Sequence, residues 1–193
     1  MVAASRHRLL ALCLVVMLLP AGGGARGAEA VAGALGEYQI KAAYLYYFTT
    51  FVDWDPGTYA RTGEALVIGV LGADPFGVIL DDTLRGKSFN NRKIVVRRFA
   101  SIKDARDCHV LFISASERDR LPSILKALEG AAVLTVGDLD QFAARGGQIE
   151  FRTEEKKVRF DINVAAVEKV HLKVSALLMK LGRVVDATGR QGG

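Results

Sequence analysis

The sequence has few of the residues on which most enzymes and metal proteins depend. Its 193 residues include only two cysteines, three histidines and one tryptophan. Cys13 lies in an apolar N-terminal stretch that we expect to be removed, as argued below, so Cys108 is the only cysteine of the mature chain. One cysteine cannot form a disulfide within the chain even in an oxidising compartment. No spacing of histidine, cysteine and carboxylate side chains proposes a metal centre. We therefore expect neither a metal ion nor another cofactor.

Motifs for binding phosphate groups are also missing. The run G-A-D-P-F-G at residues 72–77 has neither the G-x-G-x-x-G spacing of dinucleotide-binding loops nor the ending of a P-loop. Gly86-Lys87-Ser88 has that ending, but Asp81 stands where the motif requires its first glycine. At residues 72–77 and 86–88 the sequence therefore favours structural turns over phosphate-binding loops.

Catalytic arrangements are not recognisable either. Ser114 and Ser116 lie in I-S-A-S-E and not in the G-x-S-x-G motif of a nucleophile elbow. The carboxylates and lysine of a phosphoacceptor domain are absent from the equivalent strand ends. His109 lies in an apolar strand, which favours a core or edge position over a catalytic base, and Cys108 is favoured as a small buried hydrophobe over a reactive thiol. The sequence thus predicts a protein that is not an enzyme, and an unrecognised enzyme type stays an alternative.

The charge of the chain is modest. The formal net charge is +5, and no run of lysine and arginine is longer than a pair such as Arg97-Arg98 or Lys156-Lys157. This is not the footprint of a nucleic-acid-binding protein, so we expect no nucleic acid as a partner.

The first 30 residues are typical of a secretory signal peptide. A basic start, R-H-R at residues 6–8, precedes an apolar stretch at residues 9–19. That stretch fits the roughly 7–15 residues of a signal core and is shorter than the ~18–20 that span a bilayer, although an uncleaved membrane anchor is an alternative. Ala28 and Ala30 suit the peptidase, so we predict cleavage after Ala30 and a periplasmic mature protein that does not span the membrane.

Removing residues 1–30 leaves 163 residues, a usual size for one domain, residues 31–193. Since the removed segment carries three arginines and one glutamate, the net charge falls to +3. Asp74, Ser116, Asn163 and Ser175 suit helix N-caps. Helices are expected at residues 36–54, 74–84, 116–128, 139–144, 164–168 and 176–185, strands at 65–71, 93–99, 108–113, 132–136, 148–152 and 158–162, a helical turn at 101–105 and an extended link at 170–174.

Strands that alternate with helices indicate a parallel sheet covered on both faces. The charged turn between residues 152 and 158 favours an antiparallel hairpin. We therefore predict an α/β fold, a three-layer αβα sandwich whose mostly parallel sheet has an antiparallel hairpin at one edge. Ligands of such sheets bind beyond the carboxyl ends of the strands. The candidate ligand-binding residues in those loops are Asp74, Phe76, Ser114, Glu117 and Asp138.

The first predicted helix is unusually aromatic. It contains four of the five tyrosines, and Lys41 is its only charge between Glu37 and Asp53. A helix packed on one sheet face needs one apolar stripe, so either the fold covers a second face or that face binds a partner. In the link at residues 170–174, His171 and Lys173 alternate with apolar residues and should point outward. The candidate partner-binding residues are Tyr44, Tyr46, Tyr47, Phe51, His171 and Lys173.

Several segments, taken in order, match one family pattern. They are K-A-A-Y-L-Y-Y-F (residues 41–48), F-V-D-W (51–54), V-L-G-A-D-P-F-G (70–77), C-H-V-L-F-I-S (108–114) with Ser116-Glu117, L-T-V-G-D (134–138), F-A-x-x-G-G (142–147), R-F-D-I-N (159–163) and H-L-K-V-S-A-L-L-M-K-L (171–181). Together they resemble the YfiR-type family of bacterial periplasmic proteins.

This resemblance implies regulation by binding. A family member of this type holds the periplasmic part of an inner-membrane diguanylate cyclase inactive, and its release raises cyclic di-GMP and favours biofilm growth. The expected partner is therefore an inner-membrane signalling protein, with a homo-oligomer left open. Disulfides tune such members, and this sequence departs from them because Cys108 has no partner in the mature chain. A periplasmic small-molecule sensor or carrier is the alternative function.

Cleavage of the signal peptide gives the first testable prediction. N-terminal sequencing of protein recovered from the periplasm should begin at Val31, because Ala28 and Ala30 provide the small side chains that the peptidase recognises. Folded, membrane-bound protein that retains Met1 would contradict this prediction.

Overall fold

The structure, a computed structural model, describes residues 24–54, 57–60 and 65–186. Apart from residues 24–30, the predicted signal peptide lies outside the described residues. The longest element is helix α1 (Gly24–Phe51), which starts earlier than the predicted helix at residues 36–54. Among the described residues, none of the helices is both long enough and apolar enough to cross a membrane.

Eight strands form the main sheet, in the order β10-β8-β7-β6-β5-β2-β4-β3. β3 pairs with β4 and β7 pairs with β8 in antiparallel fashion, and the other neighbours pair in parallel. The strands are β2 (Leu66–Leu71), β3 (Ser88–Phe89), β4 (Arg92–Phe99), β5 (Val110–Ile113), β6 (Leu134–Gly137), β7 (Ile149–Glu154), β8 (Lys157–Asn163) and β10 (Arg183–Val185).

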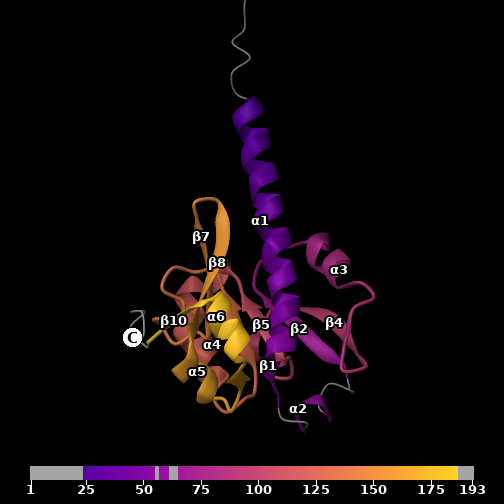
Figure 1. The fold of residues 1–193 in the computed structure, drawn as a ribbon, viewed down its shortest axis with the longest axis vertical. Coiled ribbons are helices and arrows are strands. Elements are labelled where there is room, and N and C mark those ends of the chain that lie inside the picture. The colour runs from indigo at the N-terminus through magenta and orange to yellow at the C-terminus, as the bar shows by residue number, and fades with distance from the viewer. Residues whose placement is uncertain (1–23, 55–56, 61–64, 187–193) are drawn as a thin grey trace, which may run out of the picture.

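Helices cover both faces of this sheet. On one face lie α1, α3 (Val78–Leu84), α5 (Val164–Glu168) and α6 (Ala176–Leu181), which bury apolar residues in one core cluster. The opposite face is covered by α4 (Leu121–Ala127), with the 3₁₀ turns η1 (Ile102–Asp104) and η2 (Ala115–Arg120) on the same connections. Figure 1 shows α1 lying across the first face, with its N-terminal part extending beyond the rest of the fold. The predicted α/β sandwich is confirmed.

The central strand shows why these residues form a sheet with two covered faces. Leu66, Ile68 and Val70 of β2 belong to the core cluster under α1, while Val67 and Leu71 belong to the cluster under α4. Alternate side chains of a strand point to opposite faces, so a continuous β-branched run fits a strand buried on both sides. The predicted hairpin is also present as β7 and β8.

A small second sheet joins the end of α1 to the second half of the predicted extended link. The first half is not extended as predicted, because residues 170 and 171 belong to a turn in which His171 has a φ of 59°. β1 (Val52–Asp53) pairs with β9 (Lys173–Val174) in antiparallel fashion, with Val52 opposite Val174 and Asp53 opposite Lys173. The backbone N–H of Ser175 also donates to the carbonyl of Phe51 at 2.9 Å. The short helix α2 (Gly57–Ala60) follows β1 in the sequence.

The predicted helix at residues 176–185 is wrong in its second half. α6 ends at Leu181, and residues 183–185 form β10, which pairs in parallel with β8. Gly182 is extended, and a Cβ on it would lie 2.4 Å from Cε2 of Phe160. The chain therefore leaves the helix where only glycine can approach that ring.

Three further local predictions need correction. Residues 139–144 form successive turns and not a helix. The predicted helix at 116–128 is split into η2 and α4, and Ser114 rather than Ser116 caps its start. The helix predicted from Asp74 begins at Val78, because the Asp74 carboxylate accepts the N–H of Phe76 and closes a turn. Asn163 and Ser175 do cap their helices, accepting the N–H groups of Ala166 and Leu178.

The turns at residues 139–144 generate a prediction about packing. Phe142 is fully buried, and a Cβ on Gly147 would lie 2.2 Å from its ring. Gly147→Ala should lower the free energy of unfolding by about 1–3 kcal/mol, measured by urea denaturation.

Gly36→Ala provides the matched control, because a Cβ at that exposed position of α1 meets nothing within 4 Å. It should raise stability by up to about 1 kcal/mol through helix propensity. Equal stabilities of the two alanine variants would contradict the close approach of Gly147 to Phe142.

Candidate functional site

Helix α1 presents two different faces. Ala42, Leu45 and Phe48 point into the core and are 0% exposed. On the other side, Ile40 is 46% exposed and Tyr47 is 49% exposed. One helix face therefore holds the fold together while the opposite face offers apolar groups to solvent.

The predicted tyrosines divide between these two roles. Tyr44 is half-buried, with its ring 5.2 Å from Phe160 and 6.0 Å from Phe48, so it belongs partly to the core. Tyr46 is half-buried and carries the ammonium of Lys87 over its ring at 4.8 Å. Tyr47 is the exposed one of the three. Sequence reasoning could not tell which of these tyrosines faces the sheet.

The exposed side of α1 is continuous. Its members follow helical spacing, so they line one stripe, and the ring of Tyr47 stacks on that of Phe51 at 6.4 Å with an angle of 25°. A hollow of about 370 Å³ is lined by Gln39, Ile40, Ala43, Tyr44 and Tyr47. We call Ile40, Ala43, Tyr44, Tyr47 and Phe51 the outer face of α1. Sequence reasoning missed Ile40, although the spacing from Ile40 to Ala43, Tyr44 and Tyr47 could have revealed it.

The predicted link lies beside the end of α1. His171 and Lys173 are exposed, while Leu172 is 1% exposed and packs inward, as the alternating pattern predicted. Pairing of β9 with β1 brings Lys173 opposite Asp53, two residues beyond Phe51. The helix and the link, 120 residues apart in the sequence from Phe51 to His171, are thus neighbours in the fold.

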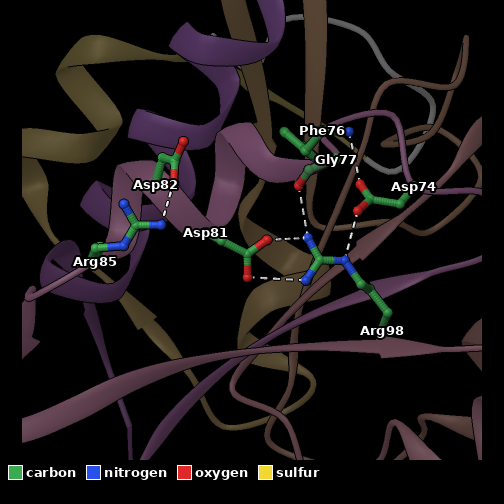
Figure 2. Close-up of polar contacts among 7 residues, drawn as sticks. All are labelled: Asp74, Phe76, Gly77, Asp81, Asp82, Arg85 and Arg98. Atoms are coloured by element: carbon green, nitrogen blue, oxygen red, sulfur yellow. Dashed lines mark hydrogen bonds and ion pairs between the residues drawn. The ribbon is translucent and has the colours of Figure 1, made fainter.

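The candidate ligand-binding residue Asp74 is engaged by its own domain. Its carboxylate accepts from the N–H of Phe76 and from Nε of Arg98, both at 2.8 Å. Figure 2 shows the Arg98 guanidinium between Asp74 and Asp81, where it also donates to the carbonyl of Gly77. These hydrogen bonds lower the pKa of Asp81 and raise that of Arg98. The cluster fastens the loop after β2 to β4.

The loops that follow β2 and β5 contact each other at the carboxyl ends of these strands, where the strand order switches. The hydroxyl of Ser116 accepts the N–H of Ala73 at 2.9 Å, and Ser114 accepts the N–H of Ser116. Glu117 is 3% exposed and pairs with Arg120 at 2.6 Å. Gly72 has a φ of 88°, and a Cβ there would lie 2.4 Å from the Ser116 oxygen. Side chains of the chain itself therefore fill the place where such folds bind ligands.

Phe76 and Asp138 anchor α1. The ring of Phe76 lies 5.2 Å from that of Tyr38 and 4.8 Å from that of Phe112. Asp138 accepts from the Tyr38 hydroxyl at 2.9 Å and from the Lys41 ammonium at 2.8 Å. Lys41 is 3% exposed and also lies 2.6 Å from Glu37. Burial, followed by the charge of Asp138, raises the pKa of Tyr38.

The residues with the most reactive side-chain types are buried. Cys108 is fully buried and donates to the carbonyl of Ala105, and burial raises the pKa of its thiol, which opposes thiolate chemistry. His109 is also fully buried, and its Nδ1 accepts the N–H of Val67 at 3.1 Å. Both occupy core positions, as predicted. Within the described part of the chain, no three His, Cys, Asp or Glu side chains are grouped to hold a metal ion.

Comparison with known proteins supports the sequence resemblance. A family model described as YfiR/HmsC-like matches residues 38–183, which run from the Tyr38 anchor in α1 to the first residue of β10. A search of curated proteins found no match.

The Lys41 anchor generates a stability prediction. Lys41→Met should lower the free energy of unfolding by about 3 kcal/mol, because it leaves the partly buried Asp138 and Glu37 carboxylates without their cation. Urea denaturation measures the loss.

Arg85→Met is the matched control, since its pair with Asp82 joins side chains that are 76% and 57% exposed (Figure 2). That change should cost less than about 0.5 kcal/mol. A Lys41 variant as stable as the Arg85 variant would show that the buried pair does not anchor α1.

Proposed function

This chain belongs to the YfiR/HmsC-like family, and from that premise we propose that it is a periplasmic regulator that binds a membrane signalling protein. The regulated protein is an inner-membrane diguanylate cyclase or a related receptor, whose periplasmic part this chain holds in the inactive state. Regulation then controls cyclic di-GMP and biofilm growth. The matched region contains the outer face of α1 and nearly the whole sheet.

The outer face of α1 is the single observation that carries the binding role. Among the described residues six large hydrophobic side chains are exposed, and two of them, Ile40 and Tyr47, lie on this face. Tyrosine side chains are favoured at interfaces because an apolar ring is combined with a polar hydroxyl, and aromatic residues dominate interface hot spots. Contiguous exposed apolar groups of this kind mark interaction surfaces.

His171 and Lys173 extend this surface with polar groups. They lie beside the C-terminal end of α1, so an apolar centre at Tyr47 and Phe51 meets a charged margin. An apolar core with a polar rim is the usual anatomy of a protein–protein interface. The margin favours a partner whose own surface combines an apolar groove with a carboxylate near its edge.

Inhibition by binding needs no chemistry from the chain. A regulator that binds only the inactive conformation of its partner shifts the equilibrium toward that conformation by mass action. The loops at the carboxyl ends of the strands, predicted as a ligand site for a sensor or carrier, have their polar side chains engaged by Arg98, Arg120 and Lys41. The geometry therefore favours the regulator over a sensor that uses those loops.

Export fits the same role. Removal of residues 1–30 shortens α1 to its part from Val31 to Phe51. All the members of the outer face and the Tyr38 and Lys41 anchors remain in that part. The proposed signal peptide is therefore dispensable for the proposed binding surface.

Tyr47→Ala is the variant that tests the surface. It should weaken partner binding by about 1–4 kcal/mol at a nearly constant melting temperature, because the ring is half exposed and contributes little to the core. Ile40→Ala and His171→Ala should show the same separation. A photo-crosslinker at position 47 should capture a membrane protein with a diguanylate cyclase or kinase domain, and cellular cyclic di-GMP should rise in the Tyr47 variant.

Two controls define what counts as failure. Lys126→Ala on α4, at the opposite face of the sheet, should leave both binding and stability unchanged, while Phe48→Ala should lower the melting temperature. The proposal fails if no outer-face variant weakens binding more than the Lys126 variant does, or if each one weakens binding only in proportion to lost stability.

A further inference from the structure

A second surface lies on the side of β7 and β8 that faces away from α1. Phe151 and Phe160 contact α1, with both rings near Tyr44. Because side chains alternate along a strand, Arg152, Arg159 and Asp161 point to the opposite face. At this edge of the sheet β10 lies beside α6 (Figure 1).

A hollow of about 540 Å³ opens here between β7, β8 and the segment from α6 to β10. Its polar wall consists of Arg152, Arg159 and Arg183 with Glu154, and Met179 and the exposed Leu181 contribute apolar surface. The volume falls within the roughly 300–1,000 Å³ that is usual for small-molecule sites. Three guanidinium groups and one carboxylate make its lining cationic.

Three carboxylates lie beside these three arginines, and the two that form ion pairs hold Arg152 and Arg183. Asp161 is 3% exposed and holds two of the arginines, with Oδ1 2.8 Å from Arg152 Nη2 and Oδ2 2.5 Å from Arg183 Nη2. Glu154 contacts Arg152. Glu150, on the same face, accepts the backbone N–H groups of Gln141 and Ala143. The Asp161 and Glu154 carboxylates therefore form their ion pairs with Arg152 and Arg183, and neither pairs with Arg159.

Arg159 is the cation that remains. Within the described part of the chain its side chain makes no hydrogen bond or ion pair, and Arg159 stands directly opposite Arg152 in the antiparallel ladder. Like charges at opposed positions are destabilising. The buried Nε of Arg152 also has no hydrogen-bond acceptor among the described residues.

Protection of an open strand edge does not account for this arrangement. β10 pairs with residues 161–163 only, so among the described residues the earlier part of β8 has no strand beside it on that side. One charged side chain is enough to discourage pairing with another chain, and the exposed Lys157 provides it on the same face. Three converging guanidinium groups are more than protection of the strand edge requires.

We infer that this hollow binds a small organic anion, a molecule with a carboxylate or phosphate group attached to an apolar body. The guanidinium fork of Arg159 donates to the oxyanion, for which its geometry is suited, and Arg183 supplies a second positive group. Met179 and Leu181 contact the apolar body. This ligand site is separate from the outer face of α1 and does not depend on the proposed partner.

Calorimetric titration of the purified protein with phenyl phosphate and with benzoate tests the site. Saturable binding of at least one of them is expected, and neutral phenol should not bind. Arg159→Gln should weaken binding by at least about tenfold, because charge-assisted hydrogen bonds are lost. Its melting temperature should stay close to that of the unmodified protein, since the exposed side chain of Arg159 has no ion pair to lose among the described residues.

Lys157→Gln is the matched control, because it removes the same charge from the same strand and face outside the hollow. Its binding should stay within about twofold of the unmodified protein, because Lys157 is solvent-exposed and does not line the hollow, and an exposed charge without direct contact contributes little. The inference is overturned if neither anion binds saturably at millimolar concentration, or if the Arg159 and Lys157 variants bind equally well.

Discussion

Packing of one side of α1 against the sheet is the contact on which the other features depend. Leu45 and Phe48 fill the core over β7 and β8, where Phe48 lies 5.7 Å from Phe151 and 5.3 Å from Phe160. This contact fixes the rotation of the helix, so Ile40 and Tyr47 must point away from the sheet. It also brings Tyr38 and Lys41 over the loop after β6. An aromatic-rich helix thus becomes both a core element and an exposed surface.

Polar side chains of the described residues also occupy the carboxyl ends of the strands near the switch in strand order between β2 and β5. Many doubly wound proteins leave a crevice at this position, because the connections diverge at the switch in strand order. Here the chain supplies its own groups: Lys41 neutralises Asp138, Arg98 bridges Asp74 and Asp81, and Ser116 caps the loop after β2. Ionic groups that could recognise a ligand are used to hold the helix and the loops together.

Much of the architecture was predictable because its signals are local. The apolar run of β2, the charged turn between β7 and β8 and the caps Asn163 and Ser175 each specify their element from nearby residues. The ends of elements that depend on distant packing were not predictable: Gly182 ends α6 because it approaches Phe160, and the turns at 139–144 follow the burial of Phe142. In the candidate site, periodicity identified α1, but only its rotation against the sheet separates Tyr47 from Tyr44. The arginine hollow was invisible because the hairpin register and β10 assemble it.

The position of α1 at the start of the chain has a consequence for biogenesis. Tyr38 and its partner Asp138 are 100 residues apart, and the rings of β8 that pack on Tyr44 come later still. During synthesis, and during the proposed export, the helix therefore emerges long before the surface that will cover its inner side exists. During that interval both of its sides expose aromatic groups, a condition that favours aggregation. Docking of α1 is expected to be a late folding step, and a nascent chain of this kind is a natural client for chaperones.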